Sequence, residues 1–166
     1  MLASVIQTDR LDLRPLGLAD IDSFVDLHAE AWVTRFVDPY PRDRALARLA
    51  EVERQWTERG YGLFAAVCRD SGAFIGRCGL NYWEQFDEVE AAWTLHPTAW
   101  GRGYATEAAR ACVDWGFEMF GFPRITAMIR HGNTASVRGA ERLGFSPRRE
   151  EIVAGHPVTV YVGDRI

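Results

Sequence analysis

The alternation of hydrophobic and polar residues changes period along the chain, and each period predicts a different element. Residues 10–14 alternate leucine with charged residues, which predicts a half-buried strand that Pro15 ends. Apolar residues then recur at helical spacing over residues 20–28 and 42–59, and Gly60 is a suitable end for the second helix. The first third of the chain therefore predicts one strand followed by two helices.

The middle of the chain predicts a hairpin and a further strand. β-Branched and aromatic residues are frequent in residues 61–68 and 73–82, and the turn between them is rich in residues that tolerate left-handed backbone. Residues 90–96 alternate with a period of two, which places Trp93 on the opposite face of the strand from Glu90.

The last third of the chain alternates helices with strands. Small apolar residues return at helical spacing over residues 106–120. The pattern then predicts a strand over residues 123–130, a short helix that starts at Asn133, and a final strand over residues 158–162. Because no repeat or linker interrupts this order, we expect one mixed α/β domain over residues 1–166.

Composition narrows the class of protein. Apolar residues make up 48% of the chain and charged residues 25%, which is ordinary for a globular domain. No apolar run approaches the roughly 18 residues that a membrane span needs. Residues 1–10 lack the basic start and long apolar stretch of a signal peptide. We therefore expect a cytoplasmic protein that does not bind membranes.

Charge, cysteines and histidines exclude further classes. The net charge of −4 argues against broad binding to nucleic acid and suits a cationic partner slightly better. The cysteines have no C-x-x-C spacing, so we expect core thiols rather than disulfides or a zinc site: Cys68, Cys78 and Cys112. The histidines have no metal-binding spacing and are predicted at the surface or at strand ends: His28, His96, His131 and His156.

A glycine-spaced turn carries the most specific chemical signal. Residues 100–106 read W-G-R-G-Y-A-T and join the strand ending near Leu95 to the following helix. Gly101 and Gly103 lack a Cβ, and the first N–H groups of a helix are unpaired, so such a turn can hold a diphosphate. A tight turn without a ligand is one alternative. Half of a dinucleotide-binding G-x-G-x-x-G is another, although Thr106 replaces its third glycine.

Five segments resemble the GNAT superfamily of acyl-CoA-dependent N-acyltransferases, most closely its Rim type, which includes ribosomal-protein N-terminal acetyltransferases. They are T-D-R-L-D-L-R-P at 8–15, F-I-G-R-C-G-L at 74–80, residues 90–108, N-T-A-S at 133–136 and E-R-L-G-F at 141–145. The resemblance implies an α/β (α+β) fold. Its mixed, mostly antiparallel sheet of about six to seven strands would be flanked by about four helices and splayed at the acyl-CoA site.

The same resemblance implies acetyl-CoA as co-substrate, without a metal. Backbone N–H groups of the glycine turn would hold the coenzyme A pyrophosphate, and the edge of the strand at residues 90–95 would hold the pantetheine arm. The superfamily pattern has Gln or Arg where this chain has Trp100. The residues expected to bind coenzyme A are Trp93, Leu95, Trp100, Gly101, Arg102, Gly103, Tyr104, Ala105, Thr106 and Asn133.

Three residues are the catalytic candidates that the resemblance implies. Glu90 would accept the proton of the incoming amine directly or through water, and could otherwise be a solvated residue at a strand end. Asn133 would bond the pantetheine or a water, and is also a good helix N-cap. Ser136 would protonate the departing thiolate. The tyrosine that often acts as general acid in the superfamily is replaced here by Ala140, so Ser136 or water must do this work.

The acceptor is less defined than the donor. The resemblance assigns the acceptor site to residues 20–60 and to the loop at 148–157. Aromatic and acidic residues there could receive a cationic amine or could equally be packing residues: Glu30, Trp32, Phe36 and Tyr40. A protein N-terminal amine, an aminoglycoside, a polyamine and an amino acid all remain candidates. A non-catalytic acyl-CoA-binding module is the main alternative function. The sequence does not specify an oligomeric state, and a homodimer is kept as an alternative.

Overall fold

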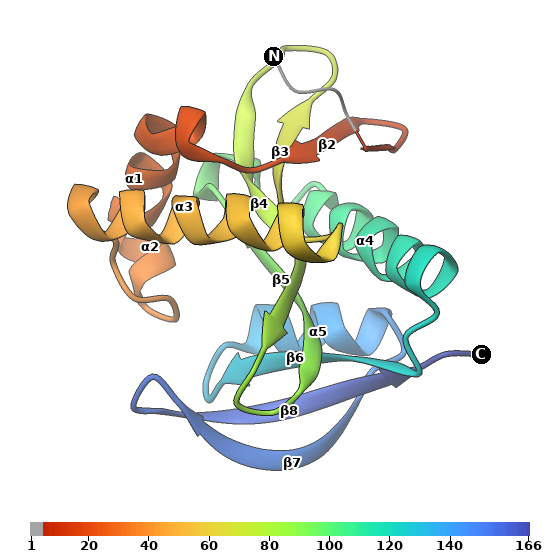
Figure 1. The fold of residues 1–166 in the computed structure, drawn as a ribbon. Helices are drawn as coiled ribbons and strands as arrows, with labels where there is room; N and C mark the ends of the chain where they lie inside the picture. The colour runs from red at the N-terminus through yellow and green to blue at the C-terminus, as the bar shows by residue number, and fades with distance from the viewer. Residues whose placement is uncertain (1–4) are drawn as a thin grey trace.

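The computed structural model of the protein describes residues 5–166, which build one twisted sheet with helices on both faces (Figure 1). Residues 1–4, part of the stretch that argued against a signal peptide, lie outside the described residues. The strands are β1 (Ile6–Gln7), β2 (Leu11–Pro15), β3 (Leu63–Cys68), β4 (Phe74–Trp83), β5 (Glu88–Leu95), β6 (Arg124–Arg130), β7 (Ser146–Val153) and β8 (His156–Asp164). The helices are α1 (Ile21–Ala29), α2 (Ala31–Thr34), α3 (Arg42–Arg59), α4 (Tyr104–Phe120) and α5 (Thr134–Arg142), with 3₁₀ turns η1 (Leu18–Asp20) and η2 (Pro97–Ala99).

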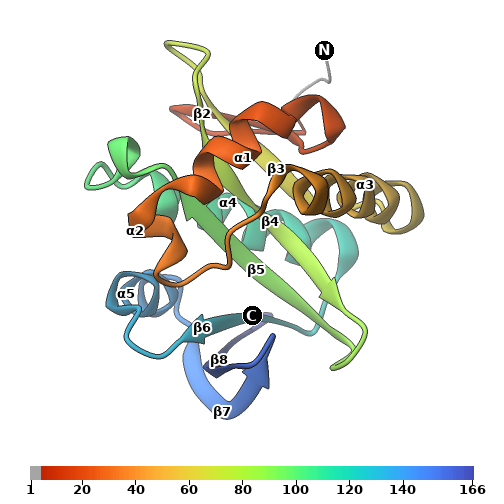
Figure 2. The same cartoon turned by 90° about the vertical axis from the view of Figure 1, so that its left-hand side faces the viewer.

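The sheet consists of two antiparallel parts joined by one parallel step. Its strand order is β1-β2-β3-β4-β5-β6-β8-β7, and all neighbours are antiparallel except β5 and β6. These two strands pair at a single position, Glu90 with Thr126. Figure 2 shows them diverging toward their C-terminal ends. The expected splay of the sheet is therefore present, and it begins at Glu90.

Helices bury both faces of the first part of the sheet. Phe24 of α1 and Leu49 of α3 pack with Leu63 on one face, while Ala108 and Cys112 of α4 form part of the cluster on the other face. α3 crosses in front of the sheet in Figure 1, with α4 beyond it. None of the helices in residues 5–166 combines the length and apolar character needed to cross a membrane.

Most of the predicted helices and strands are confirmed, and the structure contains additional short or polar ones. α3 has the predicted bounds, and Gly60 ends it in the left-handed conformation, with φ 77°. The described residues hold eight strands and five α-helices, more than the six to seven and four expected. β1 and α2 are too short to produce a periodic signal. β7 lies at the sheet edge and is rich in charged residues, so its polar sequence resembled a loop.

The cysteine prediction holds for two residues and is wrong for the third. Cys78 and Cys112 are buried, with their Sγ atoms 3.8 Å apart across the β4–α4 contact. Cys68 is only half-buried, because it ends β3 next to the exposed turn to β4. All three are free thiols.

Candidate functional site

The glycine turn forms a concave run of backbone between η2 and the start of α4. Gly101 and Gly103 have φ angles of 77° and 78°, in the left-handed region that only glycine adopts at little cost. Among the described residues, no hydrogen-bond acceptor contacts the N–H groups of residues 101–106. A helix N-terminus with free N–H groups attracts anions, because the groups also stand at the positive end of the helix dipole. The turn can therefore hold a diphosphate through main-chain atoms alone.

Arg10, near the start of the chain, holds this turn in place through side-chain contacts. Its guanidinium donates to the carbonyl oxygen of Arg102 at 2.8 Å and to Glu107 of α4 at 2.7 Å. The guanidinium also lies 4.2 Å from the ring centroid of Tyr104. Thr8 donates to the same Glu107 carboxylate at 2.6 Å. Sequence analysis missed this role of Arg10, although Arg10 lies within one of the five resembling segments.

Trp100 closes the turn onto the end of β5. Its indole Nε1 donates to the carbonyl oxygen of Leu95 at 2.9 Å, while the side chain stays 48% exposed. The tryptophan thus replaces the expected Gln or Arg with a contact inside the protein. The side chain of Arg102 is exposed, and its carbonyl oxygen is the atom that accepts from Arg10.

A cavity of about 950 Å³ opens where β5 and β6 separate. Four of the predicted site residues line it together, two from β5 and two from the start of α5: Glu90, Trp93, Asn133 and Ser136. Leu95 and the glycine turn are not among its lining residues and lie beyond it, toward the C-terminal end of β5. The structure thus separates the predicted residues into a group that lines the cavity and a group in the glycine turn. We call the turn, residues 101–106, the cradle.

Glu90 is buried at the point where the sheet splits. Its side chain is 9% exposed, and its Oε1 accepts a hydrogen bond from the indole Nε1 of Trp83 at 2.9 Å. Burial raises the pKa of this carboxyl, although the hydrogen bonds from Trp83 and from the Met128 backbone oppose the shift, as do Arg77 and Arg48. The alternative that Glu90 is a solvated strand-end residue is wrong. A buried carboxyl with a raised pKa is a stronger proton acceptor than an ordinary carboxylate.

Asn133 and Ser136 meet at the first turn of α5. Asn133 is the N-cap, and its Oδ1 accepts a hydrogen bond from the backbone N–H of Ser136 at 3.3 Å. Both side chains also line the cavity. Residue 140 is an alanine buried in the core, and its methyl side chain supplies no hydroxyl group. Capping is therefore an observed role of Asn133, and a role toward a ligand remains a prediction.

His28 is buried, contrary to the expectation of a surface position. The imidazole is 1% exposed, its Nδ1 lies 2.9 Å from the Phe24 carbonyl oxygen, and its Nε2 accepts from Nε of Arg77 at 3.2 Å. Burial, reinforced by the charge of Arg77, lowers the pKa of His28 to about 3. His28 is therefore neutral near pH 7, donating through Nδ1 and accepting through Nε2.

The other three histidines are partly exposed, as predicted, and each contacts an acidic residue: His96 with Glu30, His131 with Glu150 and His156 with Asp38. Within residues 5–166, no group of three or more His, Cys, Asp or Glu side chains is arranged to hold a metal ion.

Of the four aromatic and acidic residues expected at the acceptor site, two line the cavity and two do not. Phe36 and Tyr40 line the cavity, as the resemblance implied. Trp32 is 59% exposed and Glu30 is engaged with His96, and neither is a lining residue. The loop expected at 148–157 consists of most of β7 and the turn to β8. From this segment, Val153 and Ala154 reach the cavity.

Comparisons with known proteins give one family. The chain matches the model of the acetyltransferase (GNAT) domain over residues 10–146. A 111-residue segment is 37% identical to the uncharacterized protein YkkB of Bacillus subtilis (strain 168), spanning 64% of this chain and 64% of that protein, less than two thirds of its length. The uncharacterized N-acetyltransferase p20 of Bacillus licheniformis is 28% identical over 165 residues, covering 95% of this chain and 93% of p20.

Solved structures share the fold over nearly the whole chain. An acetyltransferase from Agrobacterium tumefaciens str. C58 is 30% identical, with a TM-score of 0.83, covering 96% of this chain and 94% of that one. RimL, a ribosomal L7/L12 α-N-protein acetyltransferase in complex with coenzyme A, is 18% identical, with a TM-score of 0.81 and 97% of both chains covered. At that identity, the likeness to RimL concerns the fold alone.

Proposed function

Because the chain belongs to the GNAT acetyltransferase family, we propose that it moves an acetyl group from acetyl-CoA to a primary amine by direct attack in a ternary complex. The observation that carries this proposal is Glu90, a buried carboxyl with a raised pKa on a cavity next to the cradle. The position supports both needs of the reaction, a proton acceptor and a site where a thioester can enter beside the sheet.

The cradle would bind the pyrophosphate of acetyl-CoA. The free N–H groups of residues 101–106 supply donors, and Arg10 with Glu107 holds the turn in shape. From there the pantetheine arm would run along the edge of β5 at Trp93 and Leu95, which β6 leaves unpaired beyond Glu90. This path leads the thioester from the cradle into the cavity.

The transfer itself needs one proton acceptor and one proton donor. The nitrogen lone pair of the neutral amine attacks the thioester carbonyl carbon, a C–N bond forms, and the C–S bond breaks with its electron pair on sulfur. Glu90 takes the proton of the amine directly or through water. The thiolate takes a proton from the Ser136 hydroxyl or from water, and solvent then restores the serine. Because residue 140 is an alanine, this position contributes no acid.

The acceptor would be a protein N-terminal amine or a small-molecule amine. The resemblance to the Rim type favours the first class, and the cavity, which Phe36 and Tyr40 help to line, is compatible with either. Cytoplasmic location, a single domain over residues 1–166 and a homodimer remain predictions.

The experiment that tests the proposal follows release of free thiol from acetyl-CoA with a thiol-reactive dye. N-terminal peptides, amino acids, polyamines and aminoglycosides serve as acceptors, and mass spectrometry identifies the acetylated product. Turnover with one class would support the proposal and name the acceptor class. Binding of acetyl-CoA without thiol release across the panel would favour the alternative, a non-catalytic acyl-CoA-binding module of the same fold.

Two variants separate the catalytic assignments. Glu90→Gln keeps the hydrogen-bond acceptor for Trp83 but removes the base, so kcat should fall about 100-fold or more. Ser136→Ala should lower kcat less than about tenfold, since water can protonate a good leaving group. Equal, small losses in both variants would contradict both assignments.

A further inference from the structure

Arg77 is a charged side chain that lines the cavity without an acidic partner. It lies on β4, and among residues 5–166 no carboxylate oxygen comes within 4.0 Å of its guanidinium nitrogens. Its observed hydrogen bond is from Nε to His28, a neutral acceptor. Burial lowers the pKa of Arg77 to about 10, which still leaves it charged near pH 7. The protein thus orients this guanidinium without neutralising it.

A second guanidinium faces the same cavity from the helix above. Arg48 of α3 donates to the Asn81 side-chain oxygen at 3.1 Å, and its closest carboxylate is Glu51 at 3.4 Å, which is 55% exposed. The charge of Arg48 contributes to the lowered pKa values of both Arg77 and His28. Two like charges that line one cavity destabilise each other, and Glu51, 3.4 Å from Arg48, offsets the charge of Arg48 but not that of Arg77.

Among the acidic residues that line the cavity, Glu90 is the buried one, and its carboxylate is engaged by a group other than Arg77. Its carboxylate accepts a hydrogen bond from the indole Nε1 of Trp83. Glu90 pairs with Asn81 and Thr94 pairs with Arg77 across β4 and β5, so the two charges share one face of the sheet, four residues apart. That offset is about 13 Å along the strands, which long side chains partly bridge.

We propose that the acceptor amine carries an anionic group, and that Arg77 with Arg48 binds this group while the amine lies at Glu90. A planar guanidinium binds a carboxylate or a phosphate through two parallel hydrogen bonds. The assignment rests on the proposed function and names its substrate class. It replaces the expectation of a purely cationic amine, since Arg77, a guanidinium without an acidic partner, lines the same cavity as the proton acceptor.

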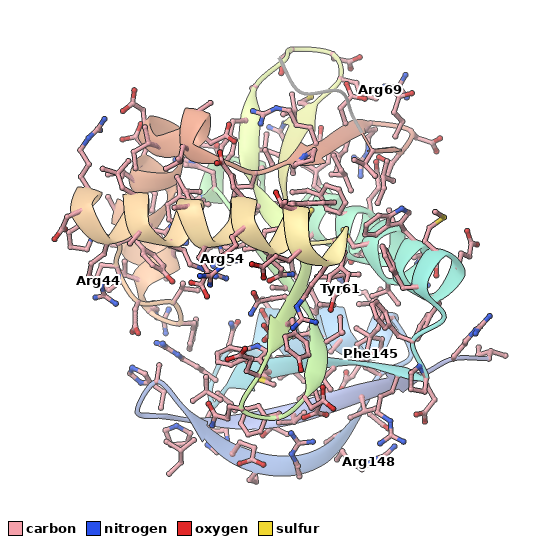
Figure 3. The ribbon with its side chains drawn as sticks, viewed as in Figure 1. Arg44, Arg54, Tyr61, Arg69, Phe145 and Arg148 are labelled. Carbon is pink, nitrogen blue, oxygen red and sulfur yellow. The ribbon has the colours of Figure 1, made fainter. Side chains whose placement is uncertain are left out.

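His28 and Tyr40 fix the geometry of this anion site. His28 packs against Tyr40 with ring centroids 5.0 Å apart, and both pack against Phe24. The neutral imidazole occupies Nε of Arg77, leaving the two terminal nitrogens of the guanidinium for a ligand. In Figure 3, Arg54 projects from the underside of α3, on the same side as the cavity. Its side chain is 65% exposed, so it lies at the rim of the cavity.

Matched acceptors test the site in turnover. 6-Aminohexanoate is compared with its amide, and the peptide Ala-Asp-Ala-amide with Ala-Asn-Ala-amide, which distinguishes a free amino acid from a peptide N-terminus. In one pair at least, kcat/KM for the acid should exceed that for the amide on the order of tenfold or more. Arg77→Gln should bring the ratio close to one, Arg48→Gln should lower it in part, and the KM for acetyl-CoA should stay unchanged in both.

The control is Arg42→Gln, which removes an exposed arginine of α3 that does not line the cavity and should keep the full preference. Thermal melting checks that each variant is folded. Equal kcat/KM for acid and amide in every pair that turns over would overturn the proposal, as would a preference that persists in Arg77→Gln.

A binding measurement keeps the anion site testable if no acceptor turns over. Trp83 and Trp93 line the cavity, so tryptophan fluorescence can follow hexanoate and hexanamide, which have no amine to acetylate. Hexanoate should bind more tightly than hexanamide, and Arg77→Gln and Arg48→Gln should each weaken its binding. Thiol release without a preference between hexanoate and hexanamide would refute the anion site alone. A preference for hexanoate without thiol release with any acceptor would refute the proposed function alone.

Discussion

The cradle and the cavity are built from different chemical groups: the cradle from main-chain atoms and the cavity from side chains. The cradle presents main-chain N–H groups on a short contiguous segment, residues 101–106, and its shape depends on two left-handed glycines. The cavity presents side chains from β4, β5, α3 and α5, among them the charged groups of Glu90, Arg77 and Arg48. Changes in the backbone conformation of the cradle should therefore alter the binding of the proposed acetyl donor. Changes in side-chain charge or in pH should alter the binding of the proposed acceptor amine.

The largest expected effect concerns His28, which holds Arg77 on the cavity side. Its folded-state pKa of about 3 lies below the ordinary value of 6.5. As pH falls below 6.5, the unfolded chain binds a proton before the folded protein does. The stability contributed by neutral His28 is complete above that pH and is lost toward pH 3. The loss amounts to about 5 kcal/mol.

His28→Gln tests this acid sensitivity. Glutamine can donate to the Phe24 carbonyl and accept from Arg77 without titrating, so the variant should lose less stability in urea melts between pH 6.5 and pH 4. His131→Gln, at an exposed site, is the control. A variant that is as acid-sensitive as the unmodified protein would show that other groups dominate the response.

The next effect concerns Arg10, which braces the cradle without touching the cavity. Arg10→Gln removes the contacts with Glu107 and with the Arg102 carbonyl, so the turn should lose its fixed shape. We expect the KM for acetyl-CoA to rise about three- to tenfold, with the acceptor KM unchanged. A change confined to the acceptor KM would contradict the separation between the two regions.

A smaller effect is expected from a single methyl group in the cradle. An added Cβ at Gly101 meets no atom within 4 Å, so Gly101→Ala tests only the cost of a φ of 77°. Stability should fall by about 1 kcal/mol, and acetyl-CoA should bind more weakly. Gly72→Ala is a matched control, since Gly72 has φ 72° and open space in a turn outside the cradle. It should show the same loss of stability with no change in acetyl-CoA binding.

The smallest effect is a gain in stability from Glu90→Gln. Because the folded-state pKa of Glu90 is raised, its ionisation disfavours the folded state, and this penalty grows as pH rises through that pKa. The variant should therefore melt at a slightly higher temperature than the unmodified protein at pH 8, and the difference should shrink toward pH 5. A lower melting temperature at pH 8 would mean that the carboxylate stabilises the fold.

The cradle could be predicted from sequence because it is local. Gly101 and Gly103 stand two residues apart before a helix, and the structure gives both the left-handed backbone that this spacing required. The cavity could not be predicted in the same way, since its residues come from distant segments. Arg77 could have been identified as a site residue, because it is a charged residue between Gly76 and Cys78 in a predicted strand.

The sequence contained evidence that His28 is buried, but the general tendency of histidines to be exposed led to the opposite prediction. It fell on the apolar face of the predicted helix with Phe24, which indicated burial, but scattered histidines are usually exposed. β7 shows the reverse, because its exposed, charged sequence carries no hydrophobic alternation and its pairing with β8 depends on tertiary context.

The single step between β5 and β6 gives the molecule an internal interface that resembles one between subunits. Only Glu90 and Thr126 pair across it, whereas side chains from both parts share one apolar cluster, including Leu80, Ile125 and Phe145. The two parts are therefore held together mainly by hydrophobic packing, and a chain break after Gly121 would interrupt no antiparallel ladder. Two fragments cut at this point should each keep their own strand pairing and reassociate as a heterodimer.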